Sequence, residues 1–340
     1  MMSRLTRSSY TKITLITILC LTICGTLTGA IHFVERFINP LGSDWGNDDN
    51  TSTGSFSIDA STVNDISISW AAGKVTVKVV DDEETNGLIQ ARESERSRPA
   101  LRWRNVGGKL EIDYGNVMSL LSCSFFNFNT KELTLLIPES YRDKLNSFSL
   151  DTVSGEHVLS GIGCKNLNVH QVSGNVHFED FSAQNLTTKI ISGTFSYNGK
   201  LAGALDVDQT SGNTTFDIKS SNPDSAKVSL TSGDMRLLVP NPNFCVELDK
   251  VSGSFASNYD LMTKGNTYYT SEALGAMSGS DVNHDTSDTH NADGLDGLDK
   301  LNGADNSHDS TASNGSAASS DTFKIRAHMV SGHLAIDKSA

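Results

Sequence analysis

The chain has 340 residues, with 40 acidic residues against 27 basic ones and a formal net charge of −13. Binding to nucleic acid rests largely on Lys and Arg contacts with phosphates, and this chain shows no basic stripe. We therefore expect no nucleic-acid partner.

The N-terminus predicts a membrane anchor. Residues 1–12 form a short cytoplasmic head with three basic residues, and residues 13–31 carry no charge. A run of this length is about long enough to cross a bilayer as a helix, and basic residues before it predict a cytoplasmic N-terminus. We expect a single-pass protein of the cell membrane with its β-domain outside. The alternative is secretion after signal-peptide cleavage near Ala30.

The next segments predict a tether and then strands. Residues 39–54 are rich in Gly, Asp and Asn and are typical of a tether. Alternating Ile and Val residues then flank Gly73, a strand, corner, strand pattern, and residues 105–114 repeat it more loosely around Gly107. We interpret both as diverged early rungs of a repeat.

Three further segments precede the regular repeats. Residues 81–99 are charged and predict a hairpin or solvated loop. Residues 117–129 are apolar without a clear period, which favours a cap on the first rung or, alternatively, an exposed patch for a partner. Residues 131–138 predict a buried strand that Pro138 ends.

Ser-Gly pairs recur about every twenty residues, which is the signature of a repeat protein. A β-branched residue precedes each Ser, and apolar residues alternate with polar ones on both sides of the pair. The pairs are Ser154-Gly155, Ser173-Gly174, Ser192-Gly193, Ser211-Gly212, Ser232-Gly233, Ser252-Gly253 and Ser331-Gly332.

Each repeat is therefore predicted to be a strand, a Ser-Gly corner and a second strand. A single repeat cannot bury its apolar face, whereas stacked repeats bury a continuous column. We predict an all-β fold, a β-solenoid or β-roll-like stack of two-strand repeats over residues 56–257, preceded by one transmembrane helix. The Ser and Gly residues are assigned as structural turns, because no general base recurs beside the serines.

The repeat stops after residue 257. Residues 258–321 are rich in Ser, Asp, Asn and Gly and are predicted to be a disordered acidic insertion. A calcium loop is disfavoured there, since the run around Asp293 lacks the alternating acidic ligands of such loops. The pattern returns in residues 322–340, which we expect to be the final solenoid rung.

A strand ending at Pro138, followed by Leu-rich strands that close on Ser-Gly behind an N-terminal apolar segment, resembles the bacterial family of unknown function labelled "putative adhesin". The resemblance covers about residues 66–251 and 323–337. It implies the fold and an adhesin-like role, and it brings no catalytic residues with it.

No motif points to a cofactor, a metal or catalysis. The three cysteines outside the predicted span are widely spaced, and His157, His170 and His177 occupy different columns of the repeat. An outward column includes Asp151 and Asp208, but three rungs separate them by about 14 Å, too far for a glycosidase pair.

We therefore expect a non-enzymatic binding or scaffolding module of the bacterial envelope with an unidentified envelope or host surface ligand. An accessory or regulatory protein of an envelope-stress sensing system is one alternative. A carbohydrate-active β-helix enzyme is a second and less favoured one.

Overall fold

The computed structural model describes residues 51–94, 100–114, 131–274 and 322–339. Within them the chain is almost entirely β-structure, as expected. The elements before the regular repeats are β1 (Ser52–Thr53), β2 (Phe56–Asp59), η1 (Ala60–Thr62), β3 (Asp65–Trp70), β4 (Lys74–Val80), α2 (Asp82–Thr85), β5 (Leu88–Glu93), β6 (Arg102–Val106), β7 (Lys109–Asp113), β8 (Glu132–Pro138) and η2 (Glu139–Tyr141).

The repeats and the C-terminal strands follow. They are β9 (Leu145–Thr152), β10 (Glu156–Ser160), β11 (Gly163–Gln171), β12 (Asn175–Ile190), β13 (Thr194–Leu201), β14 (Ala204–Gln209), β15 (Asn213–Lys219), β16 (Ser225–Leu230), β17 (Asp234–Val239), β18 (Phe244–Lys250), β19 (Ser254–Ser257), β20 (Leu261–Lys264), β21 (Thr267–Thr270), β22 (Phe323–Met329) and β23 (His333–Lys338).

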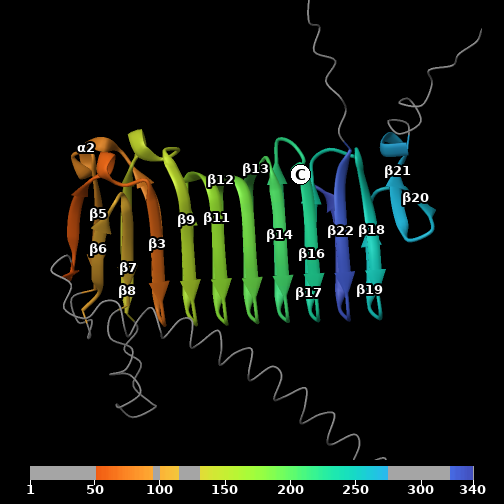
Figure 1. The fold of residues 1–340 in the computed structure, drawn as a ribbon, viewed down its shortest axis with the longest axis horizontal. Helices are drawn as coiled ribbons and strands as arrows, with labels where there is room; N and C mark the ends of the chain where they lie inside the picture. Colours follow the sequence, from red (N-terminus) through yellow and green to blue (C-terminus); the bar gives the residue numbers. More distant parts are fainter. Residues whose placement is uncertain (1–50, 95–99, 115–130, 275–321, 340) are drawn as a thin grey trace, which may run out of the picture.

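The parallel pairings arrange the rungs in two rows of strands. Within each row the strands lie side by side along the long axis of the molecule (Figure 1). Row A runs β7, β3, β9, β11, the second half of β12, β14, β16, β22 and β18. Row B runs β8, β4, β10, the first half of β12, β13, β15, β17, β23 and β19. β12 belongs to both rows because it bends at Asp180, whose φ is 47°.

The core is a set of stacked side-chain columns. Along β14 the burial alternates strictly, with Leu205 and Val207 inside and Asp206 and Asp208 outside. An aromatic ladder continues the core from rung to rung, since the rings of Phe195 and Phe216 lie 5.4 Å apart. This is the expected inside-outside pattern of a stacked β-repeat, and the β-solenoid class is confirmed.

The C-terminal rung does not lie at the end of the stack. β22 pairs with β16 on one side and β18 on the other, and β23 lies likewise between β17 and β19. Figure 1 shows β22 between β16 and β18. The expectation of a final rung at residues 322–340 was therefore wrong in position. Every rung carries the same pattern, so the sequence does not say which neighbours a rung joins.

The N-terminal end also differs from expectation. The segment around Gly107 and Gly108 is not a rung, because β6 and β7 pair antiparallel and the two glycines form the hairpin turn. The charged segment 81–99 contributes helix α2 and strand β5, and β5 pairs antiparallel with β8 and with β2. β8 is a buried strand ending at Pro138, as predicted.

The insertion was predicted to begin at residue 258, and this start is too early. Residues 258–274 contain the antiparallel hairpin β20–β21, and β21 pairs with β18. Tyr259 packs edge-on against Phe244 with ring centroids 5.0 Å apart, and Phe255 lies 4.9 Å from Tyr268. These aromatic contacts cover the last rung of the stack. The remaining part of the insertion, residues 275–321, lies outside the described residues.

The expected anchor at 13–31, the cytoplasmic head at 1–12, most of the tether at 39–54 and the apolar segment 117–129 also lie outside the described residues. Among the residues that are described, no helix has the length and apolar character needed to cross a bilayer.

Candidate functional site

The structure places the Ser-Gly pairs at the corners between row A and row B. Gly193 shows why the corner requires glycine: its φ is 92°, and a Cβ there would collide with the carbonyl oxygen of Gly174 in the next rung. That carbonyl accepts a hydrogen bond from the backbone nitrogen of Thr194 at 2.9 Å. The stack of corner glycines is Gly73, Gly155, Gly174, Gly193, Gly212, Gly233, Gly332 and Gly253.

The serines of these pairs line the solvent side of the corners. Ser173, Ser192 and Ser232 are exposed, while Ser211 is half-buried. The structural role assigned to these serines from the sequence stays a prediction.

A second corner feature escaped the sequence reasoning. Gln171 and Gln209 are fully buried, and each Nε2 donates to the carbonyl oxygen of the glycine three residues on, Gly174 or Gly212, at 2.8 Å. The signal was a glutamine two positions before the Ser, where three other repeats carry the apolar residues Ile190, Leu230 and Met329. The two glutamine side chains therefore hydrogen-bond to the corner backbone from the core side.

His157 is the one fully buried histidine among the described residues. It lies in the column of Val75 and Val176, and its Nε2 is 2.6 Å from Thr152 Oγ1. Burial lowers the pKa of His157 to about 4, so the ring is neutral near pH 7. A neutral, enclosed ring of this kind is a core residue and has no access to a ligand.

The outward column holds two aspartate-histidine contacts. His170 Nδ1 lies 2.7 Å from Asp151 Oδ1, and His328 Nδ1 lies 3.1 Å from Asp249 Oδ2. In register the column reads Asp151, His170, Lys189, Asp208, Ser229, His328 and Asp249. Asp151 and Asp208 remain three rungs apart, so the structure does not bring this carboxylate pair together.

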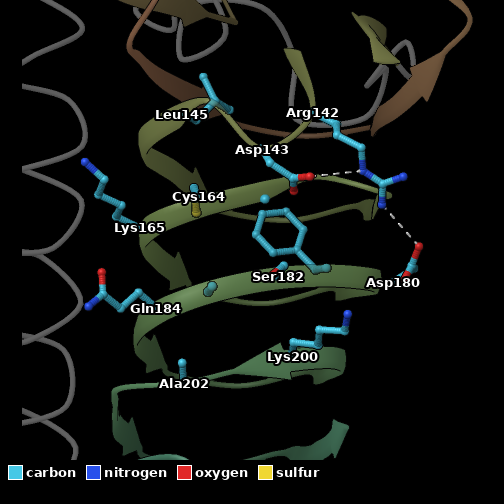
Figure 2. A pocket seen from close by; sticks show the side chains of 13 residues that line it. Arg142, Asp143, Leu145, Cys164, Lys165, Asp180, Ser182, Gln184, Lys200 and Ala202 are labelled. Atoms are coloured by element: carbon cyan, nitrogen blue, oxygen red, sulfur yellow. Dashed lines mark ion pairs between the residues drawn. The ribbon is translucent and has the colours of Figure 1, made fainter. Parts of the chain in front are cut away.

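A hollow lies at the edge opposite the corners, where the chain passes from one rung to the next (Figure 2). It has a volume of about 440 Å³. Its lining combines the charged side chains Arg142, Asp143, Lys165, Asp180 and Lys200 with the buried side chains of Leu145, Cys164, Phe181 and Ala183.

Arg142 organises the acidic side of this hollow. Its guanidinium lies 3.1 Å from Glu139 Oε1, 3.5 Å from Asp180 Oδ2 and 3.7 Å from Asp143 Oδ2, and Figure 2 shows it between the two aspartates. The hydrogen bond with Glu139 raises the pKa of Arg142. Asp180 reaches the hollow because β12 bends there, so the switch between rows also shapes the site.

Backbone packing holds the other aspartate in place. Gly163 donates its N–H to the carbonyl oxygen of Arg142 at 2.7 Å, and a Cβ on Gly163 would collide with Asp143 Oδ1. On the far side Lys165 Nζ donates to Asn146 Oδ1 at 3.0 Å. Carboxylates that accept and cations that donate therefore surround one open hollow, an arrangement suited to a polar ligand rich in hydroxyl groups.

The cysteines near these surfaces are not reactive groups. Cys164 and Cys245 are both free and buried. Burial raises the pKa of the Cys164 thiol to about 12, and burial also raises the pKa of Cys245. A thiol held in this state supplies little thiolate for nucleophilic or metal chemistry. Across the described ranges, no three His, Cys, Asp or Glu side chains come together as a metal site.

The fold defines an all-β protein built from stacked repeats. The family model described as Toastrack DUF4097 matches residues 63–288 of the chain. The chain therefore belongs to the Toastrack DUF4097 family, and the resemblance drawn from its Ser-Gly repeats is confirmed. A comparison with curated proteins finds no match.

Two solved structures are similar to this chain. One is a "putative cell adhesion protein" from Clostridium sporogenes, with 13% identity and a TM-score of 0.34 over 85% of this chain and 99% of that one. The other is a "putative adhesin" from Bacteroides fragilis, with 13% identity and a TM-score of 0.42 over 85% of this chain and 98% of that one.

Proposed function

We propose that this chain is a binding module held at the outer face of a bacterial membrane, and that its ligand is a polar polymer of the cell envelope or of a host surface. The observation that carries the proposal is the hollow at the rung connections, where Arg142, Asp180 and Lys200 surround an apolar floor. The proposed anchor is the uncharged segment 13–31, with the N-terminus in the cytoplasm and the lipid bilayer as its partner.

The rigidity of the stack supports this role. Successive rungs are hydrogen-bonded in parallel register from β4 to β13, so side chains from different rungs keep fixed mutual positions. Arg142 comes from the segment before β9, Lys165 from β11 and Lys200 from β13. Such a surface can bind a repeating ligand with little ordering cost, because the groups are already in place.

The location is tested by shaving intact cells with protease. Full-length protein carrying one epitope tag at each end is expected to lose the C-terminal tag and to keep the N-terminal one. Loss of both tags from intact cells, or release of the N-terminal tag into the medium, would contradict the anchored topology.

The ligand site is tested by co-sedimentation of the full chain with purified envelope polysaccharide. We expect binding that the double substitution Lys165→Glu and Lys200→Glu abolishes. The control is Lys227→Glu, another exposed lysine, which lies on β16 away from the hollow. Equal binding by both variants would show that the hollow is not the ligand site.

A further inference from the structure

The out-of-order C-terminal rung leaves a slot in the stack that one segment of the chain fills. Among the described strands, β16 and β18 are joined through β22, and β17 and β19 are joined through β23. Without β22–β23, four strands would each have an unpaired edge. Such edges are templates for pairing with another strand.

The inserted rung carries a complete apolar face. Its inward side chains are buried against both neighbours, while Lys324, Arg326 and His328 are exposed on the other side of β22. The buried side chains are Phe323, Ile325, Ala327, Met329, Leu334 and Ile336.

Charges on the outer face match the rung to this slot. Arg326 Nε lies 3.3 Å from Glu247 Oε2, and Asp337 Oδ2 lies 2.8 Å from Arg236 Nε. His328 contacts Asp249 as described above. The ion pairs reach strands on both sides of the slot, since Glu247 belongs to β18 and Arg236 to β17. The rung therefore makes polar contacts with the strands on both sides of the slot.

The connection between β17 and β18 keeps the slot open. It comprises residues 240–243, with prolines at 240 and 242, and it must span two strand spacings, about 10 Å. Asn222 and Asn241 hold it in place through bonds of 2.8 and 3.1 Å, and Asn243 offers its carbonyl oxygen to the backbone nitrogen of Phe323 at 3.2 Å. The same connection therefore forms a hydrogen bond with the first residue of β22.

The covalent link to the inserted rung is long. Residues 275–321 separate Leu274 from Thr322. A chain of this length can reach at most about 150 Å when fully extended. The link therefore does not oblige the rung to fill the slot of its own chain.

We propose that β22–β23 exchanges between two copies of this chain, each copy's C-terminal rung filling the slot of the other. The pairings, core contacts and ion pairs of β22–β23 are the same in the closed monomer and in the exchanged dimer, so the described contacts of the rung favour neither form over the other. The partner is a second copy, and the exchange is independent of the ligand proposed above. Exchange would place two binding surfaces on one particle.

Single cysteines in separate full-length chains test the exchange. Ser229 of β16 and His328 of β22 are register partners on the outer face. Neighbouring strands lie about 4.8 Å apart, within the Cα separation that a disulfide accepts. One tagged chain carries Ser229→Cys, a differently tagged chain carries His328→Cys, and both are expressed in the same cell and then oxidised.

The proposal predicts a covalent heterodimer, seen on a non-reducing gel with both tags. The matched control replaces Ser229→Cys by Lys189→Cys, which lies in the same outward column two rungs further away, and no heterodimer is expected from it. A chain carrying both Ser229→Cys and His328→Cys reports closure within one copy.

Two outcomes overturn the proposal. One is the absence of heterodimer from the Ser229→Cys and His328→Cys pair, whether or not the doubly substituted chain closes internally. The other is an equal yield from the Lys189→Cys control, which would show random collision between exposed thiols.

Discussion

The backbone nitrogen of Ser254 donates to the carbonyl oxygen of Gly332 at 2.9 Å, so two corners far apart in the chain are direct neighbours in the stack. The bond belongs to the intercalated rung, whose two strands are paired along both edges. Contacts of this extent should hold the rung in place even when its covalent link is cut.

We predict that cutting the chain between the described segments leaves one particle. A specific protease site introduced around residue 296 would be cleaved, and the two fragments should co-elute on size exclusion and separate only in denaturant. The uncut chain serves as the reference. Fragments that separate in native buffer would show that the rung contributes little to the stack.

Corner glycines should be far less tolerant than other glycines with positive φ. Gly193→Ala adds a Cβ against the Gly174 carbonyl, whereas Gly54, with φ 82°, has no atom near a Cβ position. We expect Gly54→Ala to cost about 1 kcal/mol from backbone strain alone. Gly193→Ala should cost several times more, measured as the free energy of unfolding in urea. Equal losses would refute the close-stacking account.

The buried His157 predicts acid sensitivity. Its pKa is about 4 when folded and about 6.5 when unfolded, so the unfolded chain binds the proton first. Stability should therefore fall as the pH drops through the window from 6.5 to 4, by up to about 3 kcal/mol.

The matched variant for His157 is the double substitution His157→Val with Thr152→Val. It restores the valine found in the neighbouring rungs and removes the hydroxyl that the ring contacts. Unfolding titrations at pH 7 and pH 4.5 should show a smaller difference for this variant. An unchanged difference would assign the acid sensitivity to other groups.

Two substitutions of Gln209 distinguish the effect of side-chain shape at the corner from the effect of charge. Gln209→Leu should change the free energy of unfolding by less than about 1 kcal/mol, because Leu230 fills the same column and Gly212 still accepts from the backbone nitrogen of Asp234. Gln209→Glu should destabilise by several kcal/mol at pH 7, since it buries a carboxylate. A thermal melt with both variants equal to the original would contradict this.

The strand, corner, strand unit could be predicted because a period of two on either side of a glycine reflects local backbone geometry. The order of the rungs could not, because a rung ending at Gly332 and one ending at Gly253 have the same inward pattern and either could stack on Gly233. The segment around Gly107 was wrongly predicted to be a rung for a related reason, because a hairpin turn and a solenoid corner both require positive φ.

The hollow was also beyond the sequence. Arg142, Asp180 and Lys200 are spread over three rungs, and Asp180 meets Arg142 only because β12 bends in mid-strand. Polar residues at loop positions carry no period that would connect them. The absence of a convergent motif in the sequence therefore said nothing about whether a surface hollow would form.

The position of β22 has a consequence for how the protein is made. β22 is synthesised after both of the strands that it joins, β16 and β18, so a nascent chain that has not yet reached β22 holds two parts that cannot be sealed together. A premature stop anywhere before Phe323 would leave the same seam open.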